Sequence, residues 1–204
     1  MRIKAIVFDL DGVLVDATEW HYEALNRALG LFGYNIARYE HLTTYNGLPT
    51  RKKLEMLSVE KNFPRGLHSL VNRIKQKYTR EEILRSCTPV FEKEYMLHQL
   101  KREGFKLAVC SNSIRESVEL MLRGSGLFEL FDFLLSNEDV KHAKPDPEIY
   151  LEAFRRLGVQ PNEALIIEDA PHGVEAARRS GGVLCQVTGF GEVDYARIKR
   201  AIEG

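Results

Sequence analysis

Two aspartates one residue apart stand at the end of an apolar run near the start of the chain. Asp9 and Asp11 follow residues 3–8 and are themselves followed at once by Gly12. If both carboxylates face one pocket, their charges repel, and the pair needs a bound cation or a raised pKa on one member. Aspartate and glycine also favour turns, so a solvated turn is the alternative interpretation. The apolar residues on both sides of the motif favour the pocket.

A second acidic pair ends a later apolar run. Glu168 and Asp169 follow residues 164–167, and a glycine again comes shortly after them, at Gly173. Carboxylates without nitrogen or sulfur ligands favour a hard divalent cation, and Mg²⁺ is the natural candidate where a phosphate is present. The two acidic pairs together predict a Mg²⁺ site.

Groups that could bind an anion follow another apolar run. Ser111 and Asn112 come directly after residues 107–110. A helical pattern begins next, with Ser113 and Glu116 spaced as a capping box. A hydroxyl, an amide and the free N–H groups of a helix start can together bind a phosphate. Many helices begin this way only to cap themselves, so this signal is weak alone.

A lysine precedes the start of another predicted helix. Lys144 stands two residues before the Asp146-Pro147 pair, in which Asp146 is a helix-capping residue and proline suits the first helical position. An ammonium at this place could neutralise a phosphate or a neighbouring carboxylate. A solvated loop lysine is the alternative interpretation.

A regular order of strands and helices must position these four clusters. Short apolar runs alternate with segments of helical periodicity, which predicts an α/β fold with a doubly wound parallel sheet. In such sheets ligands bind at the carboxyl ends of the strands, so all four clusters should meet at one edge. The predicted strands are residues 3–8, 107–110, 131–135, 164–167 and 183–187.

One long segment interrupts this alternation. Residues 16–88 carry helical periodicity and no convincing strand. Such a segment can only be an insertion, packed as a small bundle over the strand ends. We therefore predict a Rossmann-like core of residues 1–15 and 89–204, with a helical cap of residues 16–88 inserted after the first strand.

The composition is that of a folded protein and limits its partners. The 204 residues carry 29 basic and 29 acidic side chains, and 44% are hydrophobic. Without a basic excess, binding to nucleic acid or to an anionic membrane is not expected. No apolar stretch approaches the ~18 residues of a membrane span, and the three scattered cysteines are expected to stay reduced. We expect a cytoplasmic protein that acts as a monomer.

The order of the clusters resembles the haloacid dehalogenase-like (HAD) superfamily, in its phosphatase branch with a helical cap after the first strand. β-Phosphoglucomutase and phosphoglycolate phosphatase are capped members of this branch. Dehalogenases generally lack the second aspartate of the first motif, so Asp11 points to phosphoryl transfer. The matching motifs are DLDGVLVD at residues 9–16, CSNS at 110–113, KPDP at 144–147 and IEDAPHG at 167–173.

The resemblance implies a chemistry for the first motif. Asp9 would attack phosphorus as the nucleophile and form an aspartyl-phosphate. Asp11 would protonate the leaving alcohol and afterwards take a proton from the attacking water. An anionic nucleophile can approach an anionic phosphate only when a metal and a lysine offset their repulsion.

The resemblance also implies which residues bind the metal and the phosphate. Mg²⁺ would be held by Asp9, Asp169 and the backbone carbonyl of Asp11, with Glu168 a ligand or a supporting residue. The phosphate site would follow the second and third strands: Ser111 and Lys144 would hold the phosphoryl oxygens, with Asn112 supporting them.

Two residues of the predicted cap are candidates for contacts to substrate. His21 stands where β-phosphoglucomutase-like proteins carry a histidine near the active site, yet it shares a helix face with Leu25 and Ala28, which is typical of packing. Arg51 follows Gly47 in a loop that resembles the subgroup's loop with a phosphate-binding arginine, one residue later than in the subgroup. An exposed arginine at a helix start is the alternative for Arg51.

The expected activity is a Mg²⁺-dependent phosphatase for a small phosphorylated metabolite, such as a sugar or polyol phosphate. A phosphomutase of the β-phosphoglucomutase type, which would use the same core residues, is the alternative. Receiver domains also gather aspartates and a lysine at strand ends. They are about half this length and carry no inserted cap, so the enzyme is favoured over such a switch.

Overall fold

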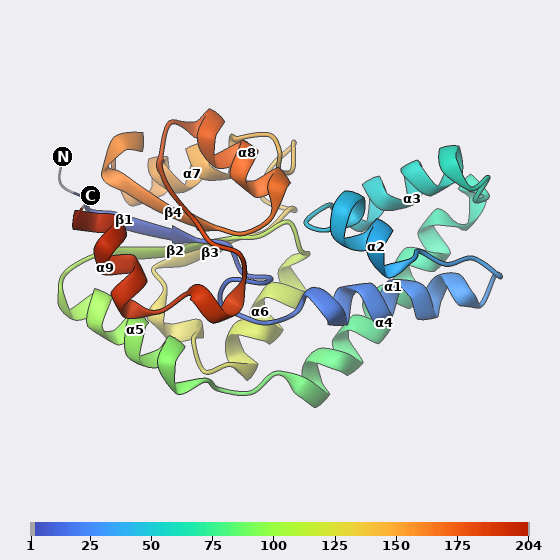
Figure 1. Ribbon diagram of the computed structural model, residues 1–204, viewed down its shortest axis with the longest axis horizontal. Helices are drawn as coiled ribbons and strands as arrows, with labels where there is room; N and C mark the ends of the chain where they lie inside the picture. The colour runs from blue at the N-terminus through green and yellow to red at the C-terminus, as the bar shows by residue number, and fades with distance from the viewer. Residues whose placement is uncertain (1–2, 204) are drawn as a thin grey trace.

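The computed structural model describes residues 3–203 and contains a parallel sheet with helices on both faces (Figure 1). The strand order is β3-β2-β1-β4-β5, so the first strand is central. The predicted doubly wound parallel sheet is confirmed. Its five strands are β1 (Ala5–Phe8), β2 (Lys106–Cys110), β3 (Phe133–Leu135), β4 (Ala164–Glu168) and β5 (Val183–Gln186).

The strands of the sheet correspond to the five predicted apolar runs. No observed strand differs from its predicted run by more than two residues at either end. Every residue of β1 is apolar and buried, because both faces of the sheet are covered. The central position of β1 places its carboxyl end between those of β2 and β4.

Alternating side chains of the strands build two separate cores. Ile6 and Phe8 of β1 belong to the core on one face, and Ala5 and Val7 to the core on the other. The helices that contribute most to the first core are α5 (Phe91–Arg102), α6 (Arg115–Gly124) and α9 (Tyr195–Glu203). Those of the second core are α7 (Glu148–Leu157) and α8 (Pro171–Ser180).

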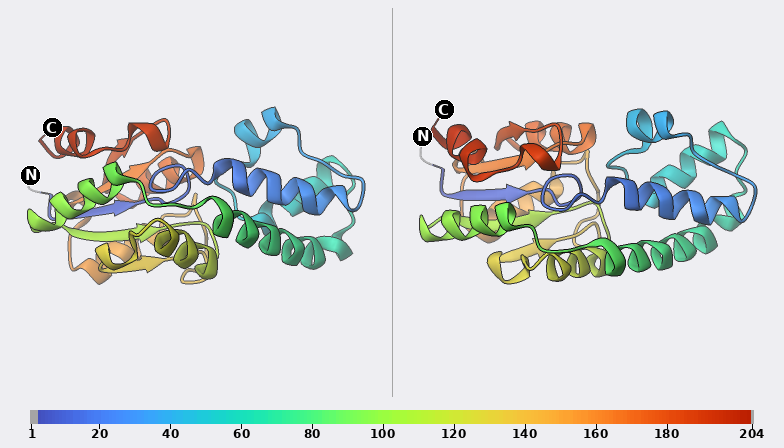
Figure 2. Two further views of the ribbon diagram at one scale, coloured as in Figure 1. Left: turned by 90° about the horizontal axis from the view of Figure 1, so that it is seen from below. Right: turned by 60° about the horizontal axis from the view of Figure 1, so that its bottom comes forward.

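The chain between β1 and α5 is helical and lies beyond the carboxyl ends of the strands (Figures 1 and 2). We call α1–α4 the cap helices; they share a hydrophobic cluster of their own, to which α1, α3 and α4 contribute. The exact domain boundaries at residues 15 and 88 stay a prediction. None of the helices in residues 3–203 is long and apolar enough to cross a membrane. The cap helices are α1 (Thr18–Gly30), α2 (Arg38–Glu40), α3 (Thr50–Glu60) and α4 (His68–Ser86), with a π-helical turn at His41–Tyr45 and a 3-10 turn at Arg65–Leu67.

Helix α8 packs directly on the carboxylate of Glu168, the last residue of β4. A Cβ atom at Gly173 would lie 1.6 Å from Glu168 Oε1, so the helix can approach this closely only because residue 173 is glycine. Glu168 is 1% exposed. The first turn of α8 therefore excludes water from one end of the second acidic pair.

We expect Gly173→Ala to lower the free energy of unfolding by about 1–3 kcal/mol, because the added methyl group overfills the site and displaces α8 or the Glu168 carboxylate. Urea unfolding followed by circular dichroism measures the change. Gly191→Ala is the matched control: a Cβ atom there meets nothing within 4 Å, so its effect should stay below about 0.5 kcal/mol. Equal stability of the two variants would contradict this packing.

Candidate active site

The strand ends and the cap helices enclose a cavity of about 140 Å³. It lies at the carboxyl end of β1. The strand order reverses at β1, because β2 and β3 lie on one side of it and β4 and β5 on the other, and such a point is the usual ligand site of parallel sheets. Residues from all four predicted clusters converge there. The core side is lined by Asp9, Asp11, Asn112, Lys144 and Glu168, and the cap side includes His21, Arg51, Lys53 and Lys75.

The Lys144 ammonium lies among buried acceptors from three strands. Its Nζ donates to Asp9 Oδ1 at 2.8 Å, to Glu168 Oε1 at 2.7 Å and to the backbone carbonyl of Cys110 at 2.8 Å. Burial alone would lower the pKa of Lys144, but the charges of Asp9 and Glu168 raise it well above its ordinary value. The side chain therefore stays charged and ties together the ends of β1, β2 and β4.

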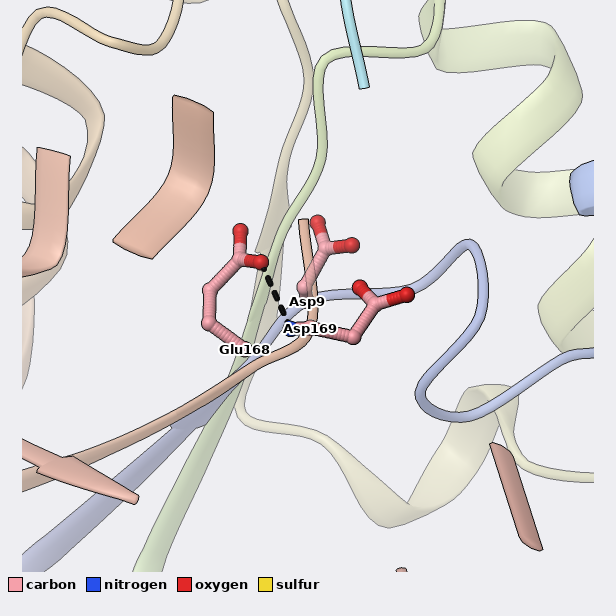
Figure 3. A group of neighbouring side chains, drawn as sticks. All are labelled: Asp9, Glu168 and Asp169. Carbon is pink, nitrogen blue, oxygen red and sulfur yellow. Dashed lines mark hydrogen bonds between the residues drawn. The ribbon is translucent and has the colours of Figure 1, made fainter. Parts of the chain in front are cut away.

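Asp9, Glu168 and Asp169 form an acidic cluster beside this lysine (Figure 3). One carboxylate oxygen of each residue lies within 4.8 Å of the other two. Burial and, after it, the charge of Glu168 raise the pKa of Asp9 well above its usual range and that of Asp169 to about 7. Among the described residues, the buried Asp169 Oδ1 has no hydrogen-bond partner. A hard divalent cation would satisfy this oxygen and offset the repulsion, so the donor set fits Mg²⁺.

Within this cluster, Glu168 is already fully hydrogen-bonded. Its Oε1 accepts from Lys144 Nζ and from the Tyr150 hydroxyl at 3.0 Å. Its Oε2 accepts from the backbone N–H groups of Asp169 at 2.9 Å, the bond drawn in Figure 3, and of Ala170 at 3.0 Å. Of the two roles implied for Glu168, these bonds favour support of Lys144 over direct binding of a metal.

The turn after β1 makes room for Asp169. Gly12 has φ +87°, in the left-handed region that glycine adopts most readily. A Cβ atom at this position would lie 2.4 Å from Asp169 Oδ2. The glycine that directly follows the first acidic motif is therefore required both by the turn and by the second acidic pair.

The Asp11 carboxylate belongs to a different hydrogen-bonded group. Its Oδ1 lies 2.6 Å from His21 Nε2, and its Oδ2 accepts from the hydroxyls of Ser111 at 3.1 Å and Ser113 at 3.0 Å. Burial raises the pKa of Asp11, but His21 and the two hydroxyls outweigh this effect and bring it to about 2. In this arrangement Asp11 is ionised and able to accept a proton.

His21 connects Asp11 to the cap. Its Nδ1 lies 3.1 Å from Lys75 Nζ, which can only donate, so Nε2 carries the ring proton and donates to Asp11. Burial and the charge of Lys75 lower the pKa of His21, which keeps the ring neutral. The interpretation of His21 as a packing residue is wrong: Leu25 and Ala28 enter the cap core, whereas His21 lines the cavity.

The predicted capping box at Ser113 is also wrong. Helix α6 begins at Arg115, and its N-cap residue Ile114 makes no side-chain capping bond. The Arg115 N–H donates instead to Glu138 Oε2 at 2.7 Å, from a neighbouring loop. Ser113 is thereby free to donate to Asp11, so the sequence pattern assigned a site residue to the helix end.

Asn112 joins three loops around the cavity. Its Nδ2 donates to the backbone carbonyls of Gly47 at 2.8 Å and Lys144 at 3.2 Å, and its Oδ1 accepts from the Lys144 N–H at 3.0 Å. Asn112 therefore fixes the backbone that carries Lys144 and holds a cap loop against the core. This geometry matches the supporting role that the family resemblance implies.

Arg51 does not join the buried residues. It lies in the first turn of α3 at the cavity rim, its side chain is 88% exposed, and its Nε pairs with Glu55 at 3.1 Å. Its position matches the alternative interpretation, an exposed arginine at a helix start. No role in binding follows from this geometry.

Two buried lysines on the cap side were not predicted. Lys53 of α3 and Lys75 of α4 are each 6% exposed and line the cavity. Burial lowers the pKa of Lys53 to about 7 and that of Lys75 to about 8. The sequence did indicate that these lysines face inward. Lys75 lies one helical turn after Val71 and Lys53 one turn before Leu57, and Val71 and Leu57 both belong to the apolar core of the cap.

Sequence comparisons agree with the motifs. A family model described as haloacid dehalogenase-like hydrolase matches residues 6–187. A phosphorylated carbohydrates phosphatase from Thermotoga maritima is 32% identical over 181 residues, which cover 88% of this chain and 82% of that protein. The pyrophosphatase PpaX from Bacillus velezensis is 30% identical over 189 residues, which cover 88% of this chain and 81% of that protein.

Solved structures share the whole architecture. β-Phosphoglucomutase from Clostridium difficile superposes with a TM-score of 0.85 at 22% identity, covering 98% of this chain and 97% of that one, a likeness of fold alone. CbbY from Rhodobacter sphaeroides, solved in complex with phosphate, gives 0.83 at 25% identity and covers 92% and 87%. The prediction of a hydrolytic enzyme is confirmed. The chain belongs to the haloacid dehalogenase-like hydrolases, the family that its four motifs indicated.

Proposed function

We propose that the protein is a Mg²⁺-dependent phosphatase that hydrolyses a small phosphate monoester through an aspartyl-phosphate on Asp9. One observation carries the proposal: the Asp9 carboxylate lies both against the Lys144 ammonium and within the acidic cluster, on the wall of a cavity. A carboxylate can attack an anionic phosphate only where positive charge offsets the repulsion. The relatives named phosphorylated carbohydrates phosphatase and pyrophosphatase support this chemistry.

In the first half-reaction, a carboxylate oxygen of Asp9 attacks phosphorus and the bond from phosphorus to the ester oxygen breaks. Asp11 gives a proton to the leaving oxygen. With a pKa of about 2 in the present contacts, Asp11 holds this proton only after its bonds to His21 and the serine hydroxyls loosen. Entry of the substrate between the core and the cap would supply that change.

In the second half-reaction, water attacks the phosphoryl group on Asp9, and Asp11 takes the proton of that water. The bond between phosphorus and the Asp9 oxygen breaks, which releases inorganic phosphate and restores the carboxylate. The phosphoryl oxygens lie near Lys144 and Ser111, with Asn112 holding the Lys144 backbone in place. Mg²⁺, when held by Asp9, Asp169 and the backbone carbonyl of Asp11, would supply positive charge to the phosphoryl oxygens.

The size of the cavity favours a small substrate, and the relative named phosphorylated carbohydrates phosphatase supports a phosphorylated carbohydrate. A panel of phosphorylated metabolites, with phosphate release and isomer formation both followed, tests this proposal. Phosphate release in the presence of Mg²⁺ supports the phosphatase. Isomerised product without phosphate release would favour the phosphomutase instead.

Asp9→Asn should reduce kcat by roughly 10³-fold or more, because an amide cannot form the covalent intermediate. Phosphate release from nitrophenyl phosphate measures the rate, and circular dichroism checks the fold. Asp16→Asn, at the exposed end of the same motif, is the matched control and should keep the wild-type rate. An Asp9→Asn rate within tenfold of the wild type would sink the covalent mechanism.

Asp11→Asn should slow hydrolysis of an alkyl phosphate by roughly 10²- to 10⁴-fold, because an amide neither donates nor removes the required protons. A nitrophenyl ester has a good leaving group and should still phosphorylate Asp9 in this variant. Hydrolysis of the phosphorylated Asp9 still needs the base, so the phosphorylated enzyme should accumulate. Intact-protein mass spectrometry should then show the added mass of one phosphoryl group. If no such species forms while turnover is slow, Asp11 is not the base.

Magnesium should change how stability depends on pH. Asp169 has a pKa of about 7 in the folded protein against 3.8 ordinarily, so the folded state without metal keeps a proton that the unfolded chain loses. This contribution to stability is fully present below about pH 4 and is lost as the pH rises through about 7, so the melting temperature should fall over that range. Saturating Mg²⁺ should remove the fall, since the bound cation replaces the proton.

The control for this titration is Asp169→Asn, measured by the same thermal unfolding series. The variant should show a smaller fall of melting temperature with pH and a smaller shift with Mg²⁺. In parallel, EDTA should abolish turnover of the wild type and added Mg²⁺ should restore it. The same Mg²⁺ shift in variant and wild type would show that Asp169 does not bind the metal.

A further inference from the structure

The cap side of the cavity carries positive charge that the proposed chemistry does not use. Lys53 and Lys75 line the cavity from α3 and α4 and are each 6% exposed. The Lys75 ammonium contacts the ring of His21. In residues 3–203, the Lys53 ammonium has neither a hydrogen-bond acceptor nor a carboxylate within bonding distance. Among the described residues, neither ammonium group of the cap forms a direct ion pair, although the charge of Asp11 acts on both.

The other buried lysines show how the chain ordinarily satisfies such a group. Lys144 is held by two carboxylates and a carbonyl. Lys93 donates to the backbone carbonyls of Phe190 and Val193. A buried charge without a partner is costly, and proteins rarely keep one. Burial and the charge of Lys75 lower the pKa of Lys53 to about 7, and the charge of Asp11 offsets this effect only in part. Lys53 is therefore a cation that lacks its partner.

The position of Lys53 limits what that partner can be. The transferring phosphate occupies the core side of the cavity, next to Asp9 and Lys144. The leaving part of the substrate must then extend toward the cap, where Lys53 and Lys75 lie. Arg51, the cap cation expected from the sequence, is exposed and already paired with Glu55. The available cation on this side is the Lys53 ammonium, with Lys75 as its neighbour.

We propose that Lys53, assisted by Lys75, binds a second anionic group on the leaving part of the substrate. This inference rests on the proposed phosphatase and narrows its substrates. They are small phosphate esters that also carry a carboxylate or a further phosphate, rather than neutral sugar or polyol monophosphates. The two lysines select such substrates because a second anion gives Lys53 the direct partner that it lacks.

Two pairs of matched substrates test this selection. 3-Phosphoglycerate and glycerol 3-phosphate share their length and their ester and differ only in a carboxylate against a hydroxymethyl group. Propane-1,3-diol bisphosphate and its monophosphate differ only in the second phosphate. With Mg²⁺ the wild type should prefer the more anionic member of at least one pair by tenfold or more in kcat/KM. The pair that discriminates identifies the anion as a carboxylate or a phosphate.

Lys53→Met is the decisive variant, because methionine keeps the length and removes the charge. It should lower kcat/KM for the preferred anionic substrate by roughly 10- to 100-fold, the loss expected for a hydrogen bond between charged groups, and change that for its neutral partner less than about threefold. Lys52→Met, the exposed neighbour on α3, is the matched control and should behave as the wild type. Equal losses on both members of a pair, or no loss on either, would overturn the proposal.

Stability separates a binding role from a structural one. Removing an unpartnered buried charge should raise the melting temperature of Lys53→Met above that of the wild type. A structural lysine would give the opposite shift, and a lowered melting temperature therefore counts against the proposal. The same scan shows whether the variant is folded before any kinetic result is interpreted.

A binding measurement keeps this inference distinguishable from the proposed function. In the Asp9→Asn background, which should not turn over substrate, calorimetry should give tighter binding of 3-phosphoglycerate or the bisphosphate than of the neutral partner, and the added Lys53→Met change should remove that difference. If nitrophenyl phosphate is hydrolysed but neither pair discriminates, the anion site is wrong and the phosphatase stands. If nothing is hydrolysed but binding still depends on Lys53, the phosphatase is wrong and the anion site stands.

Discussion

The buried contact between Lys144 and two carboxylates is the interaction on which the site depends. Four acids gather where β1 and β4 end, and without internal positive charge they would repel one another and draw in water. Lys144 supplies that charge in a geometry that uses all three of its protons. Loss of one partner from such a buried pair typically costs about 3–5 kcal/mol, because the remaining charge has no compensation. The packing of α8 on Glu168 and the bonds of Asn112 to the Lys144 backbone both serve to keep this contact in place.

The charges of the cavity are divided between its two sides. The core contributes most of the negative charge, relieved by Lys144, whereas the cap contributes Lys53 and Lys75. Asp11 stands between them, since it follows β1 and yet is bonded through His21 to Lys75 of the cap. The proton affinity of Asp11 therefore depends on where the cap lies. Movement of the cap would alter both access to the cavity and the readiness of Asp11 to hold a proton.

The fold and the core side of the site could be predicted from the sequence because both depend on patterns within short stretches of residues. Each buried strand is a short apolar run, and each functional cluster stands directly at its end, so that Asp9, Asp11 and Glu168 are found by reading a few residues at a time. Lys144 was found by its place before a helix start. Its two carboxylate partners, however, come from strands far away in the chain.

The cap side could not be predicted in the same way. The S-x-x-E pattern at Ser113 describes a helix cap as well as a free hydroxyl, and only the position of Asp11 decides between them. The spacing of Lys53 from Leu57 places it near the apolar face of α3, but its burial depends on how α3 packs against the other cap helices. Arg51, two residues earlier, carries the stronger motif but lies on the exposed side of the same helix.

The insertion of the cap also shapes how the chain must fold. Ala5 of the central strand pairs with Lys106 on one side and with Ala164 on the other, so β1 has no partner close to it in sequence. Closing loops of this length is entropically costly and slows folding. During synthesis β1 leaves the ribosome before the other strands, and its apolar residues stay unpaired until the cap and then β2 have been made. The strand that leads into Asp9 is thus made before both of its neighbours and is paired on both sides only after β4 has been made, so its apolar residues stay open to aggregation for longer than those of the later strands.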